Sequence, residues 1–143
     1  MGDYNDDPYS PSLAQHLLAT RDRELVRKND SYLYNPFWRM LGESAPFNHG
    51  NESKSICGTY YYSSGKPSRW FTFDQIMFSS AFFQNGPFLL NEGRSMIIWN
   101  EDLDSRIRSS DGIFDHLPVL SVIDVKEATH MAISNTLTEL MDF

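Results

Sequence analysis

The sequence predicts a mixed α/β fold in which the strands pair mainly antiparallel. Segments rich in threonine, aromatic and branched residues, which are typical of strands, outnumber the segments with helical spacing. Turn-forming residues separate these segments along the chain. The 143 residues are the length of one domain and contain no internal repeat or low-complexity tract. We therefore expect a single α/β domain rather than two cores.

The first part of the chain is predicted to contain short helices and loops. Ser10-Pro11-Ser12 is a typical helix start, and leucines at helical spacing follow it, which predicts a short helix at about 11–20. The charged stretch 21–35 is predicted to be loop. Residues 37–41 are expected to form one or two helical turns, and residues 42–55 are loop by composition.

The strands are predicted to come mainly from the rest of the chain. Threonine and aromatic content, short apolar runs and alternation of apolar with polar residues are the signals. They place strands within 58–62, 71–79, 95–99 and 117–125.

The segments between and after these strands carry weaker signals. Residues 63–67 contain Gly and Pro and predict a turn, 80–95 look irregular, and 100–112 are charged and predict a solvated loop. Residues 127–141 have the pattern of an amphipathic helix. We therefore expect a domain over 1–126 and a terminal helix over 127–143.

Composition limits the classes of function. The formal charge of −7 and the pI near 4.9 weigh against a general nucleic-acid binder and against an anionic membrane surface. They do not weigh against a metal site, because Mg²⁺ prefers carboxylate oxygens. Cys57 is the single cysteine, so no intrachain disulfide can form, which is consistent with a reducing compartment. No signal-peptide pattern and no apolar run of about 20 residues is present, so we expect a soluble chain of unknown localisation.

Three short segments place carboxylate, amide and imidazole groups beside apolar strands. They are Gly2-Asp3-Tyr4-Asn5-Asp6, Phe73-Asp74-Gln75-Ile76 and Phe114-Asp115-His116-Leu117-Pro118-Val119. A charge at the end of a buried strand is costly to desolvate, which favours a role with a metal or a partner. Each segment also has a simple structural interpretation: a turn for the first, a strand-end cap for the second, and a capped turn with a satisfied edge histidine for the third.

Taken together and in this order, the three segments resemble the endonuclease/exonuclease/phosphatase superfamily, whose members include pancreatic deoxyribonuclease and the inositol-phosphate phosphodiesterases. Gly2-Asp3-Tyr4-Asn5 is similar to the Gly-Asp-Phe-Asn motif of that superfamily, with Tyr in place of Phe. Phe73-Asp74-Gln75-Ile76 is similar to its Asp-Tyr-Ile strand. Phe114-Asp115-His116-Leu117-Pro118-Val119 is similar to its Ser-Asp-His-Leu-Pro-Val motif, with Phe in place of Ser.

The resemblance extends over residues 1 to about 126 and is greatest to bacterial members. In those members a Tyr-Asn-Pro-x-Trp segment and a Trp-x-x-x-Asp-Gln-Ile strand occur together. Tyr34-Asn35-Pro36-Phe37-Trp38 and Trp70-Phe71-Thr72-Phe73-Asp74-Gln75-Ile76 fit this pattern.

The resemblance implies metal-dependent hydrolysis of a phosphate ester, with a role for each matching residue. His116 is expected beside the scissile phosphate, and Asp74 is expected to hold His116 and favour its protonated form. Asp3 is expected to orient or deprotonate the attacking water, and Asn5 to donate to a phosphate oxygen. Asp115 is expected to be a ligand, directly or through water, of Mg²⁺ or Mn²⁺. No cofactor-binding residues besides these are expected.

The resemblance also implies a fold, which is one half of a four-layer αββα sandwich with helices on one face of a mainly antiparallel sheet. The superfamily domain is about twice this length, and its first half supplies an early Asn and the Glu that is the main metal ligand. Neither motif occurs here, so we expect a truncated gene, an internal start or a fragment. The expected partners are a phosphate-ester substrate and either an amino-terminal half or a second copy. Nucleic acid stays an open substrate class beside small phosphoesters and lipid head groups.

Two other hypotheses remain open at this stage. The chain could be a non-catalytic remnant or partner-binding module of the same fold, which predicts an open hydrophobic face. It could also be an unrelated α/β binding protein, in which case the candidate residues should be scattered. Walker, dinucleotide-binding, zinc-ligand and serine-elbow patterns are absent, and Cys57 has no histidine near it in sequence that would make it a nucleophile.

Overall fold

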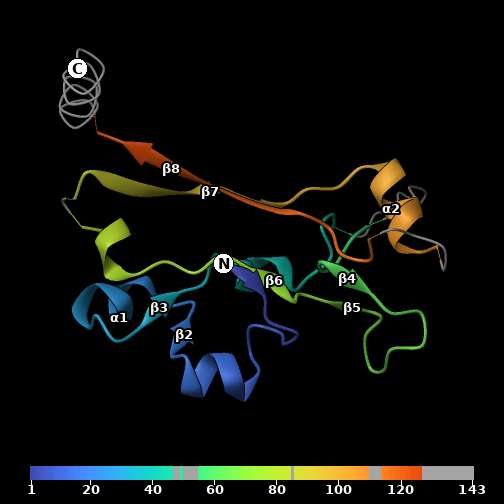
Figure 1. Ribbon diagram of the computed structural model, residues 1–143, viewed down its shortest axis with the longest axis horizontal. Coiled ribbons are helices and arrows are strands. Elements are labelled where there is room, and N and C mark those ends of the chain that lie inside the picture. Colours follow the sequence, from blue (N-terminus) through green and yellow to red (C-terminus); the bar gives the residue numbers. More distant parts are fainter. Residues whose placement is uncertain (47–48, 50–54, 85, 110–113, 127–143) are drawn as a thin grey trace, which may run out of the picture.

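The computed structural model describes residues 1–46, 49, 55–84, 86–109 and 114–126. A long two-stranded ribbon of β7 (Phe88–Ile97) and β8 (Val119–Val125) extends along the molecule above the shorter elements (Figure 1). Helix α1, Arg23–Lys28, lies below one end of this ribbon, and helix α2, Glu101–Ile107, lies at the other end. The amino terminus lies between these ends, next to β6 (Asp74–Gln75).

The strands in the described ranges form four two-stranded sheets, three antiparallel and one parallel, which confirms a mixed α/β structure with mainly antiparallel pairing. The antiparallel pairs are β1 (Gly2–Asp3) with β6 (Asp74–Gln75), β4 (Tyr60–Tyr61) with β5 (Trp70–Phe71), and β7 (Phe88–Ile97) with β8 (Val119–Val125), and the parallel pair is β2 (Ala19–Thr20) with β3 (Leu33–Tyr34).

Three short helical turns complete the described structure. They are η1 (Ser12–His16), η2 (Pro36–Met40) and η3 (Ser80–Phe82). The helical turns predicted at 37–41 are confirmed by η2, which begins after Asn35, whose side chain accepts from the amide of Phe37 at 3.0 Å. The helix predicted at 11–20 is present only as η1, because Leu18 takes a positive φ of 56° and β2 follows at once.

The prediction of loop over 21–35 is wrong, because α1 lies within it. The Asp22 side chain accepts from the Leu25 amide at 3.1 Å and so caps the helix. Glu24 lies in the first turn and Arg27 in the last, which is the favourable arrangement with respect to the helix dipole. The charges that suggested a solvated loop therefore include the groups that stabilise the two ends of a helix.

The prediction of loop over 100–112 is wrong at 101–107, where α2 lies, and its residues 110–112 lie outside the described residues. The Asn100 side chain accepts from the Leu103 amide at 2.8 Å and begins α2. Ile107 and Asp104 of α2 are buried, and Arg108 after its end bonds Asp104 at 2.7 Å. Capping and one-sided burial make this acidic segment helical.

The prediction of irregular structure over 80–95 is also wrong, because most of β7 lies there. Its pairing with β8 shifts register between Asn91 and Met96, and this irregularity interrupts the alternation that marks a strand in sequence. The strand predicted at 95–99 is only the end of β7. The strand predicted at 117–125 is confirmed by β8.

The other sequence predictions have mixed outcomes. The strand predicted at 58–62 is confirmed by β4, although it is short. The strand predicted within 71–79 is divided, because β5 pairs with β4 and the chain then crosses to pair β6 with β1. The turn at 63–67 is present, with the Gly65 amide donating to the Tyr62 carbonyl at 2.9 Å. The predicted terminal helix lies outside the described residues.

An apolar cluster joins α2 to the strands next to it. Ile56, Ile107 and Leu117 are buried at its centre, and partly buried aromatic residues pack around them. Arg108 adds a cation–π contact, because its guanidinium lies 4.3 Å from the centre of the Tyr61 ring. This cluster fixes the backbone that immediately follows His116.

A buried pair of amide side chains ties the amino-terminal loop to the rest of the structure. Asn35 Nδ2 donates to Gln75 Oε1 at 2.6 Å, and Gln75 Nε2 donates to the carbonyls of Asp6 and Thr72 at 2.7 and 2.8 Å. Asn35 and Gln75 are both fully buried. These hydrogen bonds hold the Asn35-Pro36 segment against Gln75, the residue directly after Asp74.

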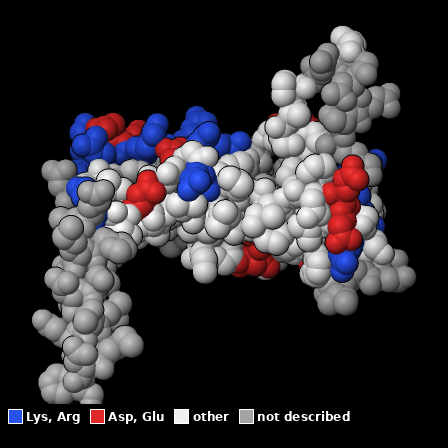
Figure 2. All heavy atoms as spheres, turned by 90° about the horizontal axis from the view of Figure 1, so that it is seen from above, with Lys and Arg blue, Asp and Glu red and all other residues white. Residues whose placement is uncertain are grey.

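The ribbon of β7 and β8 has a different surface. Several of its large apolar side chains are about two-fifths exposed, among them Phe88, Met96, Leu120, Ile123 and Val125. Figure 2, which looks onto this side, shows broad uncharged surface along the middle of the molecule. No helix within the described ranges is both long and apolar enough to cross a membrane.

Candidate active site

The pairing of β1 with β6 places two of the candidate carboxylates side by side. Asp3 and Asp74 are cross-strand partners, as are Gly2 and Gln75. The Tyr4 amide donates to the Phe73 carbonyl at 2.9 Å and continues this pairing by one residue. Cross-strand partners project to the same face of a sheet, so the two carboxylates point to the same side.

His116 comes to the same place from the segment before β8. It forms an isolated antiparallel bridge with Tyr60, and its Nδ1 lies 2.7 Å from Asp74 Oδ2. Since an ionised carboxylate only accepts hydrogen bonds, Nδ1 is the donor in this contact. The neutral ring then carries its proton on Nδ1 and leaves Nε2 as the acceptor.

Asp3, Asp74 and His116 form one compact group. Each offers a ligand atom, and these atoms all lie within 4.8 Å of one another. Asp3 is exposed, whereas the side chains of Asp74 and His116 are about one-fifth exposed. The group therefore lies at the surface with one open side, as a site for a solvent-borne substrate requires.

Asn5 lies beside this group because of its backbone conformation. Its φ is +52°, in the left-handed region that asparagine tolerates better than most residues. Its amide donates to Asp3 Oδ1 at 2.9 Å, which closes a turn, and its Nδ2 is 3.4 Å from Asp3 Oδ2. The turn interpretation of this segment and its candidate role at the site are thus compatible, since the turn orients the Asp3 carboxylate.

Asp115 lies on the other side of the imidazole. Its Oδ1 is 3.9 Å from His116 Nε2, and 76% of its side-chain surface is exposed. Among the described residues, no hydrogen bond fixes the rotamer of the Asp115 side chain. Asp115 is therefore free to turn toward an ion or a substrate near Nε2. All five residues that the sequence indicated lie in one region, so the hypothesis that they are scattered does not describe this structure.

Sequence reasoning missed two residues that contact Asp74 and His116. Thr59 is fully buried, and its hydroxyl oxygen accepts from the amides of Phe73 and Asp74, both at 3.1 Å. The Tyr60 ring lies 4.9 Å from the His116 ring, centre to centre, and stacks on Phe73 at 5.4 Å. Thr59 and Tyr60 stand next to each other in a segment whose composition indicated only a strand.

Gly58 is the signal in the sequence that could have drawn attention to this segment. A Cβ at Gly58 would lie 2.4 Å from the Phe71 carbonyl oxygen, so only glycine fits the close approach of the two backbones there. That approach brings Thr59 within reach of the segment that carries Asp74. In the sequence, this steric requirement corresponds to a glycine directly before a threonine in an otherwise aromatic strand.

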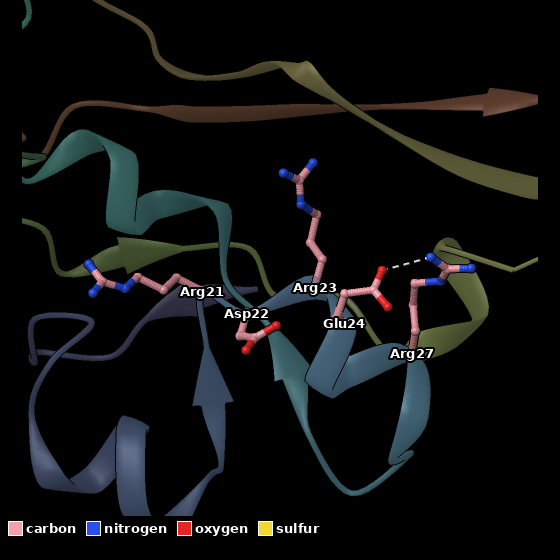
Figure 3. Close-up of a pocket in the computed structure, with 5 residues that line it drawn as sticks. All are labelled: Arg21, Asp22, Arg23, Glu24 and Arg27. Carbon is pink, nitrogen blue, oxygen red and sulfur yellow. Dashed lines mark hydrogen bonds and ion pairs between the residues drawn. The ribbon is translucent and has the colours of Figure 1, made fainter.

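The hollow beside α1 is a separate feature. Its volume is about 440 Å³, and Arg21, Asp22, Arg23, Glu24 and Arg27 line it. The three guanidinium groups point in different directions, and Glu24 forms an ion pair with Arg27 at 2.8 Å (Figure 3). Arg23 forms another with Glu92, also at 2.8 Å. Because carboxylates already neutralise most of this charge, the hollow is a poor site for a phosphate.

Protein-family models, curated protein sequences and solved structures were all compared with the chain, and none of them matches it.

Proposed function

We propose that this chain carries part of the active site of a metal-dependent phosphoesterase, as the carboxy-terminal half of a four-layer αββα sandwich. The observation that supports the proposal most directly is the contact of 2.7 Å between His116 Nδ1 and Asp74 Oδ2 beside the Asp3 carboxylate. A carboxylate that orients an imidazole next to a second carboxylate is an arrangement suited to moving protons during hydrolysis.

The proposed roles follow from the exposure and contacts of each side chain. Asp74 is the orienting group, because it is mostly buried and bonded to His116. In its protonated form the imidazole, whose Nδ1 is bonded to Asp74, gives the Nε2 proton to the leaving-group oxygen as the ester bond breaks. Asp3 is exposed and adjacent, which suits it to orient or deprotonate the attacking water. Asn5 Nδ2 is the donor for a phosphate oxygen.

The donor set fits Mg²⁺ or Mn²⁺ in part. These ions are commonly held by one or two carboxylates with water in the remaining positions, and Asp3, which is grouped with Asp74 and His116, can supply such an oxygen. Asp115 lies outside that group, so its exposed side chain would have to turn toward the ion to be a ligand. His116 Nδ1 is engaged by Asp74 and is not free as a ligand. When bound, the ion would neutralise negative charge on the phosphoryl oxygens. A further ligand, from an amino-terminal half or a second copy, is part of the proposal.

The other candidate function is a non-catalytic partner-binding module of the same fold. The exposed apolar side chains of β7 and β8 favour it, because that surface is what an open face of an incomplete sandwich would present. The two candidates differ in one measurable property, which is turnover by His116.

The test is hydrolysis of bis(p-nitrophenyl) phosphate with Mg²⁺ or Mn²⁺ by the chain and by its His116→Gln variant. Loss of a positioned proton-transfer group should lower the rate by about 10²- to 10⁴-fold. His16→Gln is the matched control, since His16 is exposed on η1 and should leave the rate unchanged. A folded chain with no metal-dependent turnover would refute catalysis by this chain on its own and leave the binding module as its function.

A further inference from the structure

Thr59 uses all of its backbone polar groups and its hydroxyl to connect separate segments of the site. Its amide donates to the Phe71 carbonyl at 2.8 Å, and its carbonyl accepts from the Leu117 amide at 2.7 Å. Its hydroxyl oxygen accepts from two consecutive amides, those of Phe73 and Asp74. No part of Thr59 is exposed to solvent.

These bonds bear on both partners of the contact between Asp74 and His116. The hydroxyl holds the backbone of Asp74 itself, and the carbonyl holds the residue directly after His116. Both segments have little regular structure of their own, since β6 has two residues and His116 pairs only through an isolated bridge. A single buried residue therefore bonds to both of the backbone segments that carry the imidazole and the carboxylate.

We propose that Thr59 is a positioning residue, which holds Asp74 and His116 at hydrogen-bond distance through its hydroxyl. The catalytic importance of this positioning rests on the proposed function, because the orientation of the imidazole affects the rate only if His116 transfers a proton. A misplacement of about 1 Å in such a group can cost about 10²-fold in rate. The geometry itself can be tested whether or not the chain turns over a substrate.

The chain offers a matched control in Thr72. Thr72 is as fully buried as Thr59 and lies two residues before Asp74, but its hydroxyl has no hydrogen-bond partner among the described residues. Thr59→Val and Thr72→Val make the same chemical change in the same region. Only the first removes an acceptor from the Phe73 and Asp74 amides. Thr59→Ser keeps that acceptor and removes only a methyl group.

The decisive measurement is an NMR spectrum of the His116 imidazole in protein labelled with ¹⁵N at histidine. The His116 signals are assigned by their absence from the spectrum of His116→Gln. In the unchanged chain and in Thr72→Val, the ring nitrogens should show the tautomer with the proton on Nδ1 and a slowly exchanging Nδ1 proton. In Thr59→Val that proton should exchange at least about tenfold faster, and Thr59→Ser should restore slow exchange. If turnover is present, Thr59→Val should lower kcat by about 10- to 100-fold with KM little changed.

Two results would overturn the proposal. One is a folded Thr59→Val protein whose His116 signals match those of Thr72→Val. The other is a Thr59→Val protein that does not fold while Thr59→Ser and Thr72→Val do, because the hydroxyl would then serve the fold as a whole. Absence of turnover with the expected NMR result would count against the phosphoesterase and not against the role of Thr59 in placing His116.

Discussion

The segments around the candidate site and the ribbon of β7 and β8 are built on opposite principles. The site depends on strands of two residues, yet fully buried polar side chains such as Thr59 and Gln75 bond several segments at once. The ribbon contains the longest strands in the described ranges, yet large apolar side chains such as Leu120 and Ile123 are exposed on it. Regular structure and tight fixation of side chains are therefore separate properties in this molecule.

The difference shows which interactions hold individual side chains in fixed positions. Side-chain bonds to backbone fix individual groups in place, and an active site requires this. A ribbon with open faces fixes its own register but leaves surface for another element to cover. In the same molecule, the segments with less regular structure are thus the better candidates for chemistry, and the longer strands are the better candidates for an interface.

The largest effect that should separate the two regions comes from two leucines close together in sequence. Leu117 is 1% exposed in the apolar cluster, and Leu120 in β8 is 41% exposed. Leu117→Ala should lower the free energy of unfolding by about 2–5 kcal/mol, because it leaves a cavity. Leu120→Ala should lower it by about 1 kcal/mol or less. Urea unfolding followed by tryptophan fluorescence measures both, and equal losses would contradict the contrast drawn here.

Substitution of a buried and of an exposed glutamine should have different effects on the free energy of unfolding. Gln75→Leu removes the acceptor of the Asn35 amide and the donor to two carbonyls, and each buried group left unpaired costs about 1–3 kcal/mol. We therefore expect a loss of about 3 kcal/mol in the free energy of unfolding. Gln15→Leu, at an exposed position of η1, should change it by about 0.5 kcal/mol or less. A Gln75→Leu protein as stable as Gln15→Leu would show that the buried amide pair does not hold this region together.

The sequence predicted which candidate residues would lie together better than it predicted the helices and strands that carry them. Asp3, Asp74 and His116 stand out because charged residues border apolar strands, and this signal is local in sequence. The length of β7 could not be predicted, since a register shift interrupts its alternation. Helices α1 and α2 were missed because charges that cap a helix and charges in a loop have the same composition.

The role of Thr59 could not be predicted for a different reason. Its partners are 12 to 58 positions away in the chain, at Phe71, Phe73, Asp74 and Leu117, and no local pattern encodes bonds of that range. The same holds for the contact of Asn35 with Gln75, 40 positions apart. Long-range polar contacts are fixed by the fold as a whole, so only a three-dimensional structure shows them.

The smallest expected effect concerns Cys57, two residues before Thr59. Burial raises the pKa of the Cys57 thiol, and the nearby carboxylates of Glu43 and Asp7 raise it further. The thiol also donates to the Leu41 carbonyl at 3.3 Å. Because the thiolate is the reactive form, the folded chain should react with a disulfide reagent more slowly than the chain in denaturant, with its rate rising at higher pH. Ionisation of the unfolded chain comes first as pH rises, so this group's contribution to stability is lost at alkaline pH.

A cysteine in the ribbon makes this measurement a comparison of the two regions. Arg94→Cys, at an exposed position of β7, combined with Cys57→Ser gives a chain with one thiol in the ribbon. That thiol should react at nearly the rate seen in denaturant, whereas Cys57 should be slower at every pH between about 7 and 9, near the ordinary range of a thiol pKa. Equal rates for the two thiols in the folded state would mean that the backbone beside Thr59 opens as readily as the ribbon surface. That result would contradict the tight fixation of the candidate site, which the proposed positioning of His116 requires.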